Sequence, residues 1–448
     1  MRRLTIDVLA AADHALIAPF SLVLDDGTFE VVEILRNLPG RRLTVGVCGA
    51  GGTPGVLKVF YGTRARRDFQ RARRGLQALA SASVPTVEIA AQGRGDVPWL
   101  LFPRLPGVTA PASADCAQLA AMLGRLHHAG FSHGDLHLGN FLRTPGGELL
   151  AIDADTVVPR VLSRRAGYRE LAVLLAQYPI PQTPELDPVA AAYLRGRALP
   201  DGALTTRTLH RLLRQARAKR VEHYLRKTLR SCSLFERREE QGQRLLLRRE
   251  VASLVEVFAR DPERYFGESA VFLKRGNSAT VVKLNIQGVP LVAKRYNLPT
   301  VWHRLRRLLR PRARFAWRNA LRLAFLGIPT ALPLGLLETG SRGNPGPAYL
   351  LMEQLRGKDL ATLTASGSID GITVKEVADI LGWLKEAELL HGDLKSTNLL
   401  LDEGRLHLID VDAVRRAPGG HRRDRQRLLA NWSPDSDIVR RLAAAIPP

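Results

Sequence analysis

One ten-residue pattern occurs twice in this chain, once in each half. Residues 133–142 read HGDLHLGNFL, and residues 391–400 read HGDLKSTNLL. Each copy is followed by an apolar run that ends in two aspartates, LLAIDAD at 149–155 and LHLIDVD at 406–412. Identity, order and spacing agree over about twenty residues, and self-similarity of that length indicates a structural repeat. The sequence therefore predicts two copies of one architecture.

Each copy has the same predicted neighbours along the chain. A segment with apolar residues at helical spacing precedes each HGD, at 116–128 and at 374–386. Further upstream a β-branched run contains one lysine, GVLKVF with Lys58 and PLVAKRY with Lys294, and turn-rich hairpin segments come before it. The order of strands, helix, strands, helix, loop, strand pair and helix predicts an α+β, two-lobed layout, present twice.

The length of 448 residues exceeds what one hydrophobic core usually serves. We expect a first domain at 1–200 and a second domain at 262–448. Residues 201–261 are polar and basic, and we expect them to form helices that close the first domain and connect it to the second. The Asp261-Pro262 pair marks the break after this connector.

The charge balance is strongly basic, with 66 Lys and Arg against 43 Asp and Glu and a net charge of +23. Such a surface attracts polyanions: nucleic acid, anionic lipid head groups or phosphorylated glycolipid. Three cysteines without ligand-like spacing favour a reducing cytosol over a disulfide or zinc site. Charged residues or prolines interrupt the apolar stretches, so we expect neither a signal peptide nor a transmembrane helix.

Four residues in each copy match the needs of phosphoryl transfer. A lysine in an apolar strand needs an anion such as a nucleotide phosphate, because a buried unpaired ammonium is costly. An aspartate in the HGD loop can accept the proton of an acceptor hydroxyl. An asparagine five residues later and a strand-terminal aspartate can hold magnesium. These candidates are Lys58, Asp135, Asn140 and Asp153 in the first copy, and Lys294, Asp393, Asn398 and Asp410 in the second.

HGDLKSTN and HGDLHLGN resemble the catalytic loop of the protein-kinase-like superfamily, whose protein kinases carry H-R-D-x4-N. IDVD and IDAD resemble its metal-binding strand end, with D-F-G replaced. In the second half, LKRGNSATVVKL, VAKRYN and RFAWRNALRLAFLGIPT are similar to the bacterial lipopolysaccharide core kinases that phosphorylate heptose or Kdo. The general resemblance implies two tandem bilobal protein-kinase-like domains. The resemblance to lipopolysaccharide core kinases covers residues 262–415.

The resemblance implies an enzyme that uses ATP and Mg²⁺ to phosphorylate a sugar of the lipopolysaccharide core glycolipid. It implies a cytoplasmic protein, peripheral on the anionic surface of the inner membrane. The eight candidates take the roles given above, and Lys395 is added to them. Lys395 stands two residues after Asp393, where Ser/Thr-type kinases place a lysine on the transferring phosphate. The first copy has His137 there, as in small-molecule kinases of the superfamily.

The sequence departs from the kinase pattern at three points. No acidic residue lies between the second strand lysine and residue 337, and Asp68 is the only one in the corresponding stretch of the first copy. The helix glutamate that normally pairs with the lysine is therefore missing. The run GAGGTPG at 49–55 fits no phosphate-binding motif, and we expect at most a flexible phosphate-covering turn there. No A-P-E-like segment follows Asp412, which favours a small or glycolipid acceptor over a protein.

Other polar residues near these motifs are expected to have structural roles. The histidines of the HGD motifs should bond to backbone rather than carry protons, the acids of the following helices should tie the loop to those helices, and the second aspartates of IDAD and IDVD should support the metal ligands. These residues are His133, His391, Glu170, Asp424, Asp155 and Asp412.

Eight arginines lie between residues 304 and 322, with tryptophans interleaved and no acid. A solvated basic face and a surface for anionic lipid or sugar phosphate both remain open, whereas nucleic acid is less favoured because no nucleic-acid-binding motif accompanies the charge. Two other functions also remain open. Lys395 favours a Ser/Thr protein kinase, and the missing helix glutamates favour a pseudokinase scaffold or regulator.

Overall fold

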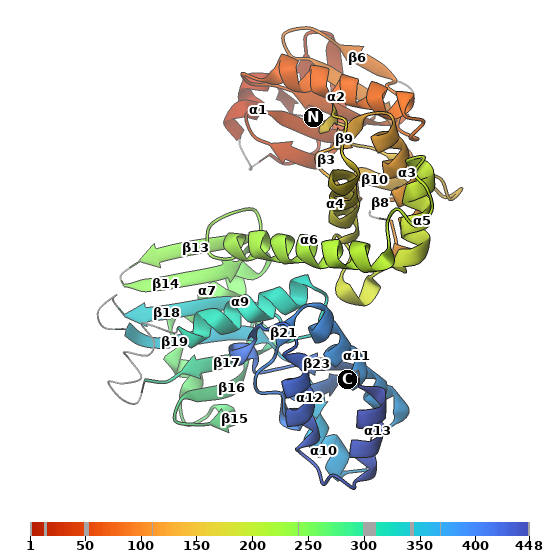
Figure 1. Ribbon diagram of the computed structural model, residues 1–448. Coiled ribbons are helices and arrows are strands. Elements are labelled where there is room, and N and C mark those ends of the chain that lie inside the picture. The colour runs from red at the N-terminus through yellow and green to blue at the C-terminus, as the bar shows by residue number, and fades with distance from the viewer. Residues whose placement is uncertain are drawn as a thin grey trace. The chain divides into compact units, whose positions relative to one another are not determined.

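The computed structural model describes residues 2–12, 16–48, 53–109, 111–240, 242–298, 311–340, 345–367 and 369–446. The chain forms two compact units, Met1–Tyr178 with Thr183–Ala216, and Pro179–Gln182 with Arg217–Pro448. Figure 1 shows helices and strands in both units, which confirms the α+β class. The expected boundaries of the two domains and the connector remain a prediction.

The first unit contains a seven-stranded sheet in the order β1-β2-β3-β4-β5-β7-β6. Every neighbouring pair is antiparallel except β1 and β2. Its strands are β1 (Arg3–Leu4), β2 (Phe20–Leu24), β3 (Gly27–Leu38), β4 (Arg42–Cys48), β5 (Pro54–Phe60), β6 (Ala91–Gly93) and β7 (Trp99–Pro103). Strand β5 is central and apolar, which places Lys58 between Thr44 of β4 and Leu100 of β7.

Helix α2 (Ala65–Ser81) packs against β5 through a face of residues that recur at helical spacing, Ala65, Phe69, Ala72, Leu76 and Leu79. The rest of the first unit is mainly helical. It contains α3 (Cys116–His128), α4 (Arg164–Leu175), α5 (Leu186–Gly196) and the first turns of α6 (Thr206–Lys227), and α1 (Ile6–Ala12) lies near the start of the chain. The predicted helix at 116–128 is thus confirmed.

Two small sheets of the first unit hold the HGD loop. Strand β10 (Phe141–Arg143) pairs with β8 (Val108–Thr109) and β11 (Leu149–Ala151), and β9 (Phe131–His133) pairs with β12 (Val157–Pro159). The HGD loop follows β9, and the IDAD aspartates follow β11. The two motifs therefore converge in space.

The second unit contains an antiparallel sheet in the order β13-β14-β18-β19-β17-β16-β15. Its strands are β13 (Phe235–Glu240), β14 (Gln243–Arg248), β15 (Val271–Arg275), β16 (Ala279–Ile286), β17 (Val289–Tyr296), β18 (Pro333–Gly340) and β19 (Pro345–Glu353). Helix α9 (Arg312–Phe325) packs on β18 and β19 (Figure 1), and its Trp317 is fully buried. Helix α7 (Ala252–Arg260) contacts β14, β16 and β18.

The helical part of the second unit repeats the plan of the first. It comprises α10 (Leu360–Ala365), α11 (Gly371–Glu386), α12 (His421–Leu429) and α13 (Asp437–Ala445). Strand β22 (Leu399–Asp402) pairs with β20 (Lys358–Asp359) and β23 (Arg405–Leu408), and β21 (Leu389–Leu390) pairs with β24 (Arg415–Arg416). The helix expected at 374–386 forms the larger part of α11. None of the described helices is both long and apolar enough to cross a lipid bilayer.

The expectation that 201–261 is helical is wrong between α6 and α7, where the hairpin β13–β14 joins the second sheet. Gly242, with φ of 78°, allows the tight turn. The side chains of FERREE pair at a spacing of two residues, Arg238 with Glu236 and Arg237 with Glu239, which is the spacing of one face of a strand. A charged exposed face made this strand look like polar helix.

We predict that Gly75→Ala destabilises the first unit. Gly75 lies within α2, and a Cβ there would collide with the backbone oxygen of Ala154, the residue between Asp153 and Asp155. Backbone cannot yield as a flexible side chain does, so we expect a loss of about 1–3 kcal/mol in free energy of unfolding, seen by calorimetry as a lower melting temperature. Gly382→Ala is the control, because Gly382 in α11 faces open space; if both variants melt alike, the contact does not constrain the helix.

Candidate active site

The strand lysine of the first unit lies between the two IDAD carboxylates. Nζ of Lys58 is 3.2 Å from Oδ1 of Asp153 and 2.8 Å from Oδ1 of Asp155. The lysine is buried in β5, so an unpaired ammonium would be costly, and the two aspartates provide the required negative charge. Asp68, the only acid on the following helix, pairs instead with Arg41.

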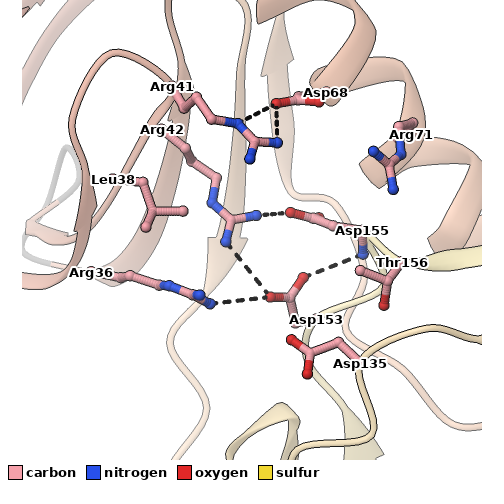
Figure 2. Close-up of a pocket in the computed structure, with 10 residues that line it drawn as sticks. All are labelled: Arg36, Leu38, Arg41, Arg42, Asp68, Arg71, Asp135, Asp153, Asp155 and Thr156. Carbon is pink, nitrogen blue, oxygen red and sulfur yellow. Dashed lines mark hydrogen bonds and ion pairs between the residues drawn. The ribbon is translucent and has the colours of Figure 1, made fainter. Parts of the chain in front are cut away.

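Two arginines of the β3–β4 hairpin, Arg36 on β3 and Arg42 on β4, approach the same carboxylates (Figure 2). Arg42 pairs with Asp155, and its Nη2 is 3.8 Å from Asp153. Nη1 of Arg36 is 4.0 Å from Asp153. These residues line a cavity of about 160 Å³ together with Leu38, Arg41, Asp68, Arg71, Asp135 and Thr156. Asp135 of the HGD loop therefore faces the same cavity as Asp153.

The charges in this cavity shift one another's pKa values. Burial lowers the pKa of Lys58 to about 8, although Asp153 opposes the shift. Burial by itself would raise the pKa of Asp153, but Lys58 and Arg42 outweigh it and the net shift is downward. Burial also lowers the pKa of Arg42. Asp153 is therefore held in its ionised form by cations of the protein itself.

The HGD loop of the first unit is held by hydrogen bonds to its own backbone and to helix α4. Nδ2 of Asn140 donates to the backbone oxygen of Asp135 at 2.9 Å. Glu170 on α4 accepts from the Ser132 hydroxyl at 2.6 Å and from the backbone N–H of His133 at 3.3 Å. Nδ1 of His133 accepts from the backbone N–H of Asp135. The expected structural roles of Glu170 and His133 are confirmed.

The second unit repeats the lysine arrangement. Nζ of Lys294 in β17 is 2.6 Å from Oδ1 of Asp410 and 2.9 Å from Oδ1 of Asp412. Asp412 also accepts from the Tyr296 hydroxyl at 2.9 Å and from Arg312 of α9 at 3.0 Å. The helix after the strand thus contributes a cation to Asp412 where a kinase helix contributes a glutamate to the lysine. In both units, the second aspartate of the motif is the additional partner of the lysine.

Asp410 and Asp393 lie on the described loops of the second unit with accessible carboxylates. Asp410 adopts the left-handed conformation, with φ of 56°, and its side chain is 34% exposed against 19% for Asp153. Nζ of Lys395 and Nη2 of Arg427 are 3.2 and 3.3 Å from Oδ1 of Asp393. The cations beside the HGD aspartate, like those beside Asp153 in the first unit, define the local charge of the site.

The second HGD loop is also held by an acid from the following helix. Asp424 on α12 accepts from the backbone N–H of His391 at 2.5 Å and of Gly392 at 3.0 Å. Nε2 of His391 is 3.3 Å from the backbone oxygen of Ile409, and burial lowers the pKa of His391. Nδ2 of Asn398 donates to the backbone oxygen of Asp393 at 2.8 Å. These contacts confirm the structural roles expected of Asp424 and His391.

Sequence reasoning missed the arginines of the β3–β4 turn. It placed the phosphate-covering turn at 49–55, of which residues 49–52 lie outside the described residues. The turn that lines the cavity comes one hairpin earlier, in NLPGRR, where Gly40 has a φ of 67°. The order of the strands gave an available signal. Since β4 and β5 are antiparallel, the turn before β4 lies at the end of the sheet where β5 ends, close to Lys58. The arginines at 304–310 also lie outside the described residues.

A buried strand lysine, a paired IDxD motif and an HGD loop with its asparagine are the features predicted for a protein-kinase-like phosphotransferase site. Residues 266–433, less than half of the chain, match the sequence model of the Lipopolysaccharide kinase (Kdo/WaaP) family. This match confirms the resemblance of that stretch to the lipopolysaccharide core kinases and the prediction of an ATP-dependent kinase.

Comparison with other proteins gives distant matches. No curated protein matches the chain. A solved structure of WaaP in complex with acyl carrier protein is 19% identical and aligns over 43% of this chain and 88% of its own, with a TM-score of 0.32. The PknI kinase domain of Mycobacterium tuberculosis, solved as a point mutant, is 19% identical over 33% of this chain and 71% of its own, with a TM-score of 0.24.

We predict that Asp412→Asn lowers kcat/KM for ATP by about 10- to 100-fold, because Lys294 loses a charged hydrogen-bond partner. The amide would also present N–H groups to Lys294 and Arg312. The measurement is steady-state phosphate transfer as ATP is varied. Asp379→Asn serves as the control, since Asp379 forms an exposed pair with Lys375 on α11. Unchanged kinetics in Asp412→Asn would show that Asp410 alone positions the lysine.

We predict that Glu170→Gln destabilises the first unit more at pH 7 than at pH 3. Burial raises the pKa of Glu170, but bonds from His127 and Ser132 outweigh it, and the net value lies below the ordinary 4.5. A lowered carboxylate pKa contributes stability that is present above the unfolded-state pKa and lost as the pH falls through the folded-state pKa. Melting temperatures at both pH values test this against Glu148→Gln on an exposed turn. An equal loss at both pH values would contradict it.

Proposed function

We propose that the second unit transfers the γ-phosphate of ATP to a hydroxyl of heptose or Kdo in the lipopolysaccharide core. One observation carries this proposal: the stretch that matches the lipopolysaccharide kinase family also holds Lys294, Asp393, Asn398 and Asp410 around one site. The transfer would take place at the inner face of the cytoplasmic membrane, where the basic protein would meet an anionic glycolipid.

In this proposal each residue has a role that its surroundings support. Lys294 would contact the nucleotide phosphates, exchanging a carboxylate partner for a phosphate. Asp393, partly exposed, would accept the proton of the sugar hydroxyl. Lys395 and Arg427 would lie close to the transferring phosphate and stabilise the negative charge that develops on it. The reaction therefore needs little covalent chemistry from the protein beyond positioning and charge.

The donor atoms of the second unit fit magnesium. Among the described residues, no three His, Cys, Asp or Glu side chains come together as a metal cage. Mg²⁺ does not need one, since it is usually held by one or two carboxylates together with substrate phosphates. Asp410 offers an accessible carboxylate, and Asn398 offers Oδ1 because its Nδ2 is already used by the loop. A bound Mg²⁺ would neutralise charge on the phosphates of ATP.

We further propose that each unit is one bilobal kinase-like domain, in tandem. Support comes from the equivalent geometry of the two units: a seven-stranded sheet with a central lysine strand, an HGD loop and an IDxD pair on that lysine. Lys58, Asp135, Asn140 and Asp153 would be the counterparts of the second-unit residues. We assign the transfer itself to the second unit, where the family match and the exposed Asp410 coincide.

The test is transfer of labelled phosphate from ATP with Mg²⁺ to dephosphorylated lipopolysaccharide core and, in parallel, to a generic protein substrate. We predict label in the core fraction, reduced about 10²- to 10⁴-fold by Asp393→Asn, because the proton acceptor is lost. Asp379→Asn on the exposed face of α11 controls for the change of charge.

Label on protein in place of the core would replace the glycolipid assignment with a Ser/Thr protein kinase, which Lys395 also favours. Transfer that survives Asp393→Asn and falls with Asp135→Asn would move the chemistry to the first unit. An absence of label in both fractions, with the protein folded, would contradict the proposal and leave a pseudokinase scaffold.

A further inference from the structure

The two units distribute positive charge differently around equivalent carboxylates. In the first unit, Asp153 lies within 4.0 Å of three cations, Lys58, Arg42 and Arg36. In the second unit, the equivalent Asp410 pairs with Lys294, whereas Arg312 pairs with Asp412. Among the described residues, Asp153 therefore has three protein cations within 4.0 Å, whereas Asp410 has one, Lys294.

Magnesium fits the first-unit site less well than the second-unit site. A divalent cation at Asp153 would lie beside two guanidinium groups and an ammonium, and like charges at such distances repel strongly in a partly buried site. Its carboxylate is also less accessible, at 19% exposed. The predicted metal role of Asp153 and Asn140 is therefore not supported by the charges around them.

The same cavity contains positive groups whose hydrogen bonding is incomplete. Four arginines and four aspartates line its 160 Å³, and Arg36, Arg41 and Arg42 pair with Asp153, Asp68 and Asp155. Arg42 is only 9% exposed, and its buried Nε has no hydrogen-bond partner among the described residues. Arg71 reaches the cavity from α2 and forms no ion pair with any described residue (Figure 2). The buried N–H of Arg42 lacks an acceptor, and the exposed guanidinium of Arg71 is available to a phosphate at the edge of the cavity.

We propose that the first unit binds a chain of phosphates without a divalent metal, with arginines supplying the charge that magnesium supplies in a kinase. Lys58 on β5 would contact one phosphate, and Arg36 and Arg42 of the β3–β4 hairpin would contact a second. Arg71 on α2 would contact the outer end of the phosphate chain. Guanidinium groups suit this task because their planar N–H groups bind phosphate oxygens in pairs. A nucleoside triphosphate and a free polyphosphate share this chemistry.

The proposal concerns binding and is independent of the transfer assigned to the second unit. The test uses the full chain and measures binding of ATP by calorimetry, once with Mg²⁺ and once with excess EDTA. We expect one site per chain to persist in EDTA. Asp410→Asn, in the second unit, should leave that site intact. Tripolyphosphate and adenosine are then added separately as competitors.

Arg71→Gln should weaken the EDTA-resistant site about tenfold or more, as expected for loss of one charge-assisted contact to phosphate. Arg36→Gln, also at an exposed position, should do the same and guards against a fold effect of either change. Arg66→Gln is the matched control, because Arg66 lies on the same helix but pairs with Asp96 outside the cavity. It should bind as the unchanged chain does.

Each outcome decides the proposal. Competition by tripolyphosphate alone, or by both competitors, supports a site for phosphates, and the second result adds a nucleoside pocket. Loss of all ATP binding in EDTA would overturn the proposal. So would EDTA-resistant binding that is lost in Asp410→Asn but kept in Arg71→Gln and Arg36→Gln, or competition by adenosine with none by tripolyphosphate.

Discussion

Both units depend on a buried ammonium that must have negative partners. Lys58 and Lys294 are each 7% exposed in the middle of a sheet, where removal from water would penalise the charge heavily. In each case two carboxylates from one short motif meet the lysine, although about a hundred residues separate them in sequence. This ion pair fixes where the loop after the small sheet must lie relative to the large sheet. The HGD loop is hydrogen-bonded to the residue before the first aspartate of that motif, so the ion pair also positions the HGD loop.

The two units show that one backbone plan can hold different charge distributions. In the first unit the extra cations beside the IDAD aspartates are Arg36 and Arg42 of the β3–β4 hairpin. In the second unit, Arg312 lies beside Asp412, and further cations lie beside Asp393, from Lys395 and from α12. Positive charge near the strand-end aspartate disfavours a metal ion there and favours an anion. In the proposed reaction, positive charge near the HGD aspartate would instead stabilise the phosphate during transfer. Two units of similar plan can therefore differ in the charges at equivalent positions.

Much of this arrangement could be predicted from the sequence because its signals are local. The helical spacing at 116–128, the lysine in an apolar strand and the fixed offset from the HGD aspartate to its asparagine each occupy one short window. The lysine's second partner could not be found in this way. No glutamate occurs in the helix that follows either lysine, whereas Asp155 and Asp412 come from far along the chain. Ion pairs between distant residues leave no periodic pattern in sequence.

The hairpin β13–β14 was missed for a related reason. Its first strand, β13, carries charges on both faces, and charge alone does not distinguish a strand edge from a solvated helix. The buried residues lie on both faces, Phe235 and Leu246 on one and Leu247 on the other, and this pattern appears only once the pairing with β18 is known. Arg36 and Arg42 were likewise visible in the sequence, but their proximity to Asp153 follows from the position of a turn in the sheet.

The left-handed backbone of Asp410 has a consequence for how this position can evolve. Apart from glycine, few residues other than asparagine and aspartate adopt that conformation at low cost. Glycine and asparagine satisfy the backbone but remove the carboxylate, and glutamate keeps the charge but strains the chain. Two independent requirements therefore intersect at a single amino acid. No single substitution of Asp410 keeps both the backbone conformation and the charge. Asp153 lacks that backbone constraint, so more substitutions are compatible with the backbone at that position of the first unit.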